Sequence, residues 1–140
     1  DTRTNQASVL TDRRVGAWTD VPKRGDGRRA LVERIVEVAR RLREDDLILT
    51  VLRAAPELAM VYISDRLGTS QQVMIDVLAE ELRKAQRDRS VRPGDPRSLA
   101  AMVLLITQSV VQSGQIVVPI IDAGKLGAEL SHALNGYLLP

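Results

Sequence analysis

The chain has 140 residues, a length that fits one domain of ordinary size with a real hydrophobic core. Its composition is 44% apolar and 27% charged, which excludes a disordered chain, and only 2% is aromatic, so the core must be built mainly from aliphatic side chains. The lack of cysteine excludes disulfides and thiolate chemistry and fits a cytoplasmic, reducing compartment. The net charge of +2, with acidic and basic residues interspersed, predicts no dense nucleic-acid-binding stripe.

Residues 1–27 are weakly patterned, and we interpret them as a linker or as the remnant of a structure that lies upstream. Val15 and Trp18 could line a short helix there. Acidic side chains nearly balance the basic ones, so the segment is not a basic arm of the kind that binds along the phosphate backbone of a nucleic acid. The chain starts at Asp1 rather than at methionine, which leaves open that it belongs to a longer gene product.

Residues 28–43 show the period of an amphipathic helix. Its expected buried face is formed by Leu31, Ile35, Val38, Ala39 and Leu42. On the opposite side Glu37 precedes Arg41 in the favourable i, i+4 order, which predicts an ordinary solvated surface.

Two further helices are expected before residue 90. The acidic pair at residues 45–46 can cap a short helix over residues 47–54, which Pro56 ends. A long helix then covers roughly residues 56–89. Gly, Thr and Ser at residues 68–70 are poor helix formers, so we expect a kink or a local break there.

The last two helices carry the strongest signals. Asp95 followed by Pro96 predicts a helix start, because the carboxylate can accept from free backbone N–H groups and proline suits the first turn. Residues 99–106 are all apolar, so this part of the helix must be buried on every side. A chain this short has few other helices to cover it, and we expect a second copy of the chain to do so. Pro119 ends this helix, and Asp122 begins the last one. No segment has the alternation of a strand, so the fold is predicted to be all-α.

The sequence offers no enzyme chemistry that we recognise. His132 is the single histidine, and a lone histidine is more often a surface or interface side chain than a base. No cluster has metal-ligand spacing, and no glycine loop is suited to phosphate. We therefore expect no catalytic residues, no metal and no cofactor.

Binding remains as the expected activity. Gln108, Gln112 and Gln115 recur on one helical face, where they either face solvent or supply the few hydrogen bonds of an apolar pocket. Methionines fill gaps in a core more often than they contact ligands, but they also line pockets for varied apolar molecules. The candidate ligand-binding residues are Met60, Tyr62, Met74, Met102, Gln108 and Gln112.

Small residues on the last two helices suggest a dimer seam. Two such helices from each of two subunits would form a four-helix bundle with a two-fold interface, unless both pack only within their own chain. The candidate interface residues are Thr107, Val111, Gly114, Val118, Gly127, Leu130, Ser131 and Leu134.

Three stretches together resemble the C-terminal regulatory domain of TetR-family transcriptional repressors. They are LREDDLILTVLRAAPEL at residues 42–58, VRPGDPRSLAAMVLLI at residues 91–106 and LNGYLLP at the end, and the resemblance covers residues 28–140. It implies a helical bundle of about five helices, a homodimer through the last two long helices, and an internal pocket for a small apolar effector.

The resemblance also implies an N-terminal helix-turn-helix for operator DNA. Residues 1–27 are too short for it and lack its pattern, so operator DNA is a partner only if such a head exists upstream. No membrane partner is expected, because polar residues interrupt the apolar stretch 99–118. The competing interpretation is a helical dimerisation or interaction module with a solid core and no pocket.

Overall fold

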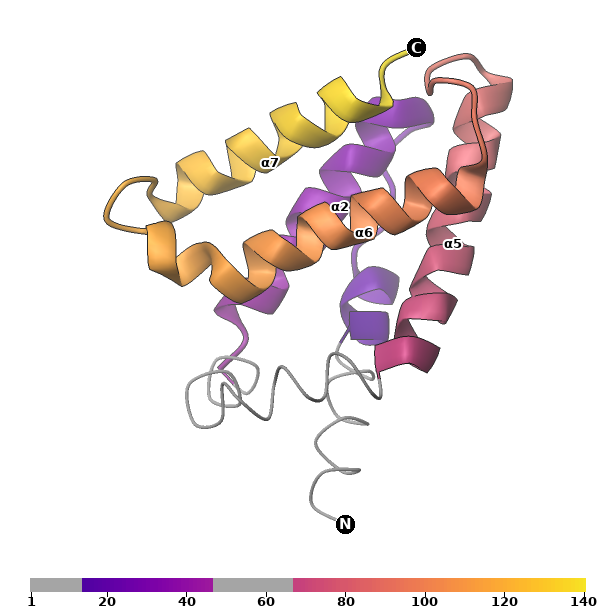
Figure 1. The fold of residues 1–140 in the computed structure, drawn as a ribbon. Helices are drawn as coiled ribbons and strands as arrows, with labels where there is room; N and C mark the ends of the chain where they lie inside the picture. The colour runs from indigo at the N-terminus through magenta and orange to yellow at the C-terminus, as the bar shows by residue number, and fades with distance from the viewer. Residues whose placement is uncertain (1–13, 47–66) are drawn as a thin grey trace.

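The computed structural model describes residues 14–46 and 67–140, with the backbone alone for residues 67–70. The elements are α2 (Gly27–Glu44), α5 (Leu67–Arg87), α6 (Pro96–Ser113), the 3-10 helix η1 (Gly114–Val117) and α7 (Ala123–Leu138), and residues 14–20 are also helical. No strand occurs in these two described ranges, which confirms the all-α prediction (Figure 1). The helix expected at residues 47–54 and the first part of the one expected at residues 56–89 lie outside them.

The predicted starts of the last two helices are confirmed. The Asp95 carboxylate accepts a hydrogen bond from the backbone N–H of Arg97 at 3.3 Å, with Pro96 in the first turn of α6. The Asp122 carboxylate accepts from the backbone N–H of Lys125 at 2.9 Å at the start of α7. Each acid thereby occupies one of the donors that a helix start leaves without a partner.

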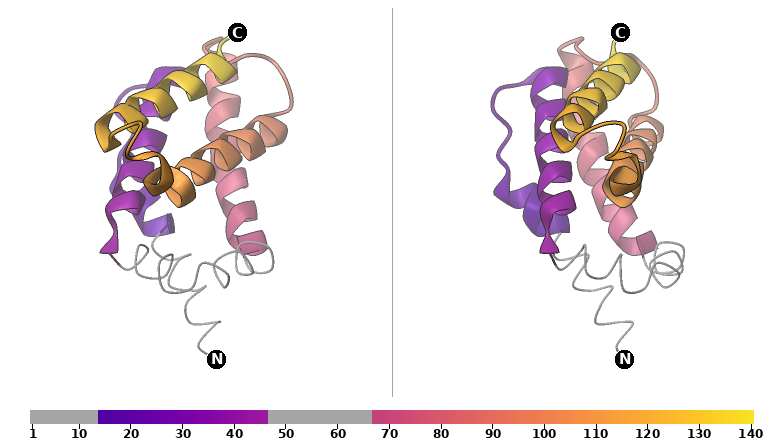
Figure 2. Two further views of the ribbon diagram at one scale, coloured as in Figure 1. Left: turned by 60° about the vertical axis from the view of Figure 1, so that its left-hand side comes forward. Right: turned by 90° about the vertical axis from the view of Figure 1, so that its left-hand side faces the viewer.

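The helices form two layers around a common core. Helices α6 and α7 lie on the same side of α2, as the views in Figures 1 and 2 agree. Helix α6 packs against both α2 and α5, and α7 packs against α2 and α6. This arrangement leaves the outer faces of α6 and α7 pointing away from the core.

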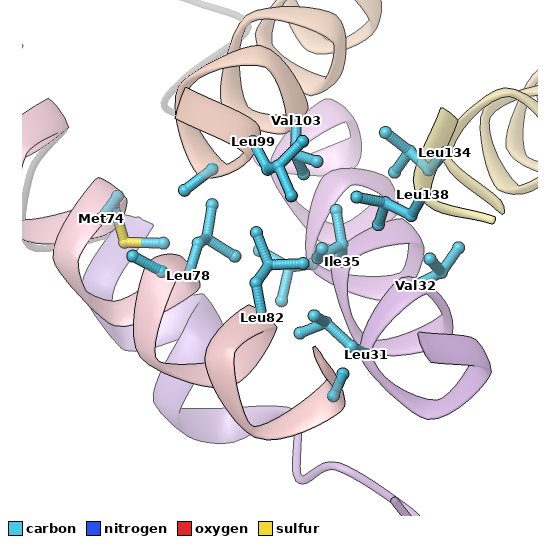
Figure 3. Packing of buried hydrophobic residues seen from close by; sticks show 14 of the residues in the cluster. Leu31, Val32, Ile35, Met74, Leu78, Leu82, Leu99, Val103, Leu134 and Leu138 are labelled. Atoms are coloured by element: carbon cyan, nitrogen blue, oxygen red, sulfur yellow. The ribbon is translucent and has the colours of Figure 1, made fainter. Parts of the chain in front are cut away.

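Aliphatic side chains fill that core, as the composition predicts. Figure 3 shows Leu78 and Leu82 of α5 and Ile35 of α2 converging beneath α6. The expected face of α2 is buried, apart from the half-buried Leu42. The core also takes in Trp18 and Val21. It therefore extends across residue 27, where we expected a linker to end and the domain to begin.

The apolar run at residues 99–106 is not buried on every side within one chain. Leu99 and Val103 are 2% and 1% exposed, but Met102 and Leu105 are 43% and 56% exposed. The reason is geometric, because α2 and α5 cover one side of α6 and nothing in the described part of the chain covers the other. This agrees with the expectation that one chain has too few helices to cover the run, and its cover by a second copy stays a prediction.

Arg28 ties three elements together at one end of the molecule. Its guanidinium donates to the carbonyl of Ser90 at 2.7 Å and to the side-chain oxygen of Asn135 on α7 at 3.1 Å. Its backbone N–H donates to the Ser90 hydroxyl at 2.9 Å. The first turn of α2 is thereby joined to the loop before α6 and to α7.

Replacing Arg28 by alanine is expected to lower the free energy of unfolding by about 2 kcal/mol, because two charge-assisted hydrogen bonds are lost in a half-buried position. Urea titration followed by circular dichroism measures the change. Arg29→Ala is the matched control, since Arg29 is exposed on the same turn. Equal effects of the two variants would contradict the assigned role of Arg28.

Candidate functional site

A mostly apolar cavity lies where residues 14–20, α2, α5 and α6 meet. Its volume is about 60 Å³. The apolar walls are formed by Trp18, Ile35, Val38, Ala39, Leu42, Met74, Leu78, Leu104 and Val111. Three polar side chains complete the lining, namely Arg14, Thr107 and Gln108. An apolar enclosure with few polar groups is the usual make-up of a small-molecule site.

Two buried nitrogens at this cavity have no hydrogen-bond partner among the described residues, and they are Nη1 of Arg14 and Nε2 of Gln108. The other end of the Gln108 amide is engaged, because its oxygen accepts from Nε2 of Gln71 at 3.4 Å. Thr107 is satisfied through its hydroxyl, which donates to the carbonyl of Val103 at 2.8 Å. Buried polar groups are nearly always paired, so the two unpaired donors mark the cavity as unusual.

Arg14 is half-buried at this position, and its Nη1 atom is buried. Burial lowers the pKa of its guanidinium from the ordinary value. Within the described ranges no carboxylate forms an ion pair with it. A partly desolvated cation without a counter-ion is costly, and a bound anion would offset that cost.

Trp18 is held in the cavity wall by Arg34 of α2. The guanidinium carbon of Arg34 lies 3.8 Å from the centroid of the indole ring, a cation–π contact. A nitrogen of the same guanidinium donates to the backbone carbonyl of Trp18 at 2.7 Å. These two contacts join the short helix at residues 14–20 to α2.

A second hollow lies beside the last turn of α2, between Arg43, Gly114 and Leu126, and its volume is about 240 Å³. Its lining combines small and apolar residues with Arg40, Arg43 and Glu44. Arg40 pairs with Glu44 at 2.6 Å, whereas Nε of Arg43 is buried without a partner among the described residues. This hollow is larger, but we regard the first cavity as the better candidate, because core side chains of three helices form its walls.

The structure brings two of the six candidate ligand residues together. Met74 and Gln108 line the first cavity. Met102 is 43% exposed on the outer face of α6, and the half-buried Gln112 is not part of the lining. Met60 and Tyr62 lie outside the described residues.

Sequence reasoning missed Arg14 and Trp18, the two cavity residues that precede α2. From the sequence we interpret residues 1–27 as a linker or an upstream remnant, because the segment is weakly patterned and its charges nearly balance. The available signal was the i, i+4 spacing of Arg14 and Trp18, which places both side chains on one face of a helix.

Most of the candidate interface residues face the interior of their own chain. Leu130 and Leu134 of α7 are 2% and 0% exposed. A Cβ atom on Gly114 would lie 3.0 Å from Leu126, so this glycine allows close approach within one chain. Thr107 and Val111 line the cavity, and Gly127 lies beside Val36. Ser131 is half-buried. Val118 differs from the others, because it is 49% exposed.

A different surface of the same two helices is uncovered. On α6 and η1 an exposed stripe runs through Met102, Leu105, Ser109 and Ile116. On α7 the exposed side carries Ala128, His132 and Gly136 at intervals of four residues. We call these seven residues the outer face. The small-residue pattern selected these two helices, but most of the residues that it named are covered within their own chain, and the dimer seam itself stays a prediction.

Two features of the described residues concern metals and membranes. No three acidic or histidine side chains among them gather as a metal site would require. The stretch Pro96–Val117 is long and apolar enough to cross a membrane, but core helices of soluble proteins often share that length and composition.

Comparison with known proteins places the chain in a family. It is 57% identical over 138 residues to a protein of Mycobacterium bovis and equally to one of Mycobacterium tuberculosis, each named an uncharacterized HTH-type transcriptional regulator. The matches cover 99% of this chain and 72% of each relative. No protein-family model and no solved structure matches the chain. The chain therefore belongs to this family of helix-turn-helix (HTH) transcriptional regulators.

Proposed function

We propose that the described domain is the regulatory part of a cytoplasmic, TetR-like repressor that binds a small apolar effector and forms a homodimer. The observation that carries the effector proposal is the cavity between residues 14–20, α2, α5 and α6. Its walls are apolar, and it retains two buried donors without partners in the described chain. Such a site offers binding energy from its walls and orientation from its polar groups.

DNA recognition would belong to another part of the regulator. The relatives are named HTH-type, and just over a quarter of each relative lies outside the match. An HTH unit needs two short helices that dock in the major groove, and dimers of such units read two half-sites. We propose that operator DNA contacts such a unit and that the present domain controls its position.

The outer face is the proposed dimer seam. It lies on α6, η1 and α7, and it carries three of the eight large apolar side chains that are exposed in the described residues, namely Met102, Leu105 and Ile116. Exposed apolar patches often mark interaction sites. A two-fold axis would pair the outer faces of two copies as a four-helix bundle. The proposed seam lies on the same two helices that the sequence analysis selected, but it uses the residues of the outer face instead of the small residues predicted there.

The cavity must widen to hold an effector. About 60 Å³ is room for a few water molecules only. Met74 has a flexible side chain in the wall, and the short helix at residues 14–20 forms another wall, so both can give way. Binding is therefore expected to change the structure around Trp18.

The chain's single tryptophan provides the test. We expect the Trp18 emission to change saturably, and the melting temperature to rise, with some members of a panel of apolar compounds. Ala39→Leu, which fills the cavity, should abolish both responses, whereas Ala133→Leu on the exposed side of α7 should retain them. Circular dichroism checks that both variants are folded. No response from the unmodified chain to any compound would overturn the effector proposal.

A second candidate function is an interaction module without a ligand. The exposed apolar side chains of the outer face favour it, because such a surface is sufficient for dimerisation alone. This alternative would be supported if light scattering shows a dimer and no compound changes the Trp18 emission.

A further inference from the structure

We infer that the effector carries a carboxylate, which accepts hydrogen bonds from the Arg14 guanidinium and the Gln108 amide while its apolar body lies between α2, α5 and α6. The inference rests on the effector site proposed above and adds the chemical class of its ligand. It follows from a comparison of the donors and acceptors in the cavity lining that already have partners with those that have none.

The charge of the site favours an anion. Arg14 brings a cation into a lining that is otherwise apolar or neutral. The guanidinium retains its proton at neutral pH, so the cavity holds a positive charge that no carboxylate among the described residues pairs. A carboxylate compensates this charge and can accept two parallel N–H bonds from one guanidinium.

The direction of the free hydrogen bonds supports the same conclusion. The Gln108 oxygen is taken by Gln71, which leaves its NH₂ group as the unused end. The Thr107 hydroxyl already donates to a backbone carbonyl. The two buried groups without a partner among the described residues are therefore donors, and an acceptor on the ligand would satisfy both. An amine could still donate to the Thr107 oxygen, but it would leave both donors unsatisfied and would meet the like charge of Arg14.

The size of the body is limited by the walls. Side chains on α2 and α5 close the cavity to about 60 Å³, so a modest apolar body that displaces Met74 fits better than a long or rigid one. Aliphatic and aromatic monocarboxylates share this chemistry. The experiment therefore includes one arm for each.

The test is a fluorescence titration of Trp18 in the unmodified chain at pH 7.5. The aliphatic arm compares octanoate with 1-octanol and octylamine, and the aromatic arm compares 4-butylbenzoate with 4-butylbenzyl alcohol. In at least one arm we expect the acid to bind tenfold or more tightly than the matched alcohol, and the amine to bind most weakly. The arm with the stronger response identifies the shape of the body.

Variants assign the preference to the two donors. Arg14→Gln should reduce the affinity for the acid to that for the alcohol and leave the alcohol unchanged, and Gln108→Leu should reduce the preference in part. Arg14→Lys keeps the charge and should restore part of the preference. Arg29→Gln removes an exposed arginine from α2 and should have no effect. Circular dichroism and the melting temperature show whether each variant is folded.

The outcomes distinguish the carboxylate inference from the effector-site proposal on which it rests. If alcohols bind as tightly as acids, or if Arg14→Gln leaves the ratio unchanged, the carboxylate inference is overturned and the apolar effector site stands. If no compound in either arm changes the Trp18 emission, the effector site itself is overturned as well.

Discussion

Truncating Leu138 to alanine is expected to lower the free energy of unfolding by about 3 kcal/mol, because it removes a fully buried side chain and leaves a cavity. Leu138 is 0% exposed at the end of α7 and packs near Val32 of α2 (Figure 3). Urea denaturation at a fixed protein concentration measures the change, since stability of a dimer depends on that concentration.

The control for this prediction is the next residue. Leu139 is 50% exposed, so Leu139→Ala removes the same atoms where half of the side chain already faces water. We expect it to cost less than about 1 kcal/mol. Similar losses for the two variants would mean that the end of α7 is not packed on α2 as described.

Replacing Leu105 by glutamate is expected to convert the proposed dimer to a monomer. Leu105 is 56% exposed at the centre of the outer face, and a two-fold seam would bring two introduced carboxylates together in an apolar interface. Burying unpaired charge there costs several kcal/mol, so the dissociation constant should rise at least a hundredfold. Light scattering measures the mass against twice the chain mass of 15.4 kDa.

Val73→Glu is the control for the dimer prediction. Val73 is 47% exposed on α5, away from the outer face, so the same change there should leave the dimer intact. The seam is rejected if the unmodified chain is a monomer at micromolar concentration or if Leu105→Glu remains a dimer.

Local rules were sufficient to predict most of the fold. Helix α2 begins and ends within one residue of the expected range 28–43, and Asp95 and Asp122 cap their helices as predicted. Such features depend on residues a few positions apart. Glu37 likewise pairs with Arg41 at 3.3 Å, in the i, i+4 order that the sequence indicates, and also with Arg40. Together they lower the pKa of Glu37 to about 2.

The faces of α6 could not be predicted from its own sequence. Its first half is apolar on every side, so periodicity does not distinguish the side that α2 and α5 cover from the side that stays open. Only the positions of the other helices decide it. The same holds for Gly114, whose small size allows the close approach of Leu126 in its own chain.

The cavity was only partly predictable for a related reason. Gln108 and Met74 were candidates because their types suit a pocket, but Arg14 lies in a weakly patterned segment that suggested a linker. Tertiary packing brings this charged side chain to the cavity. The packing involves Ile35, Val38 and Leu78, which are far from Arg14 in the sequence.

The contact between Arg34 and Trp18 has a mechanical consequence. Arg34 grips the short helix at residues 14–20 by its ring and by a backbone carbonyl, close to one end, while Arg14 at the other end reaches the cavity. A molecule that binds in this cavity would meet Trp18 and Arg14, which both belong to the short helix that Arg34 joins to α2. We therefore expect an occupied cavity to shift residues 14–20 relative to α2.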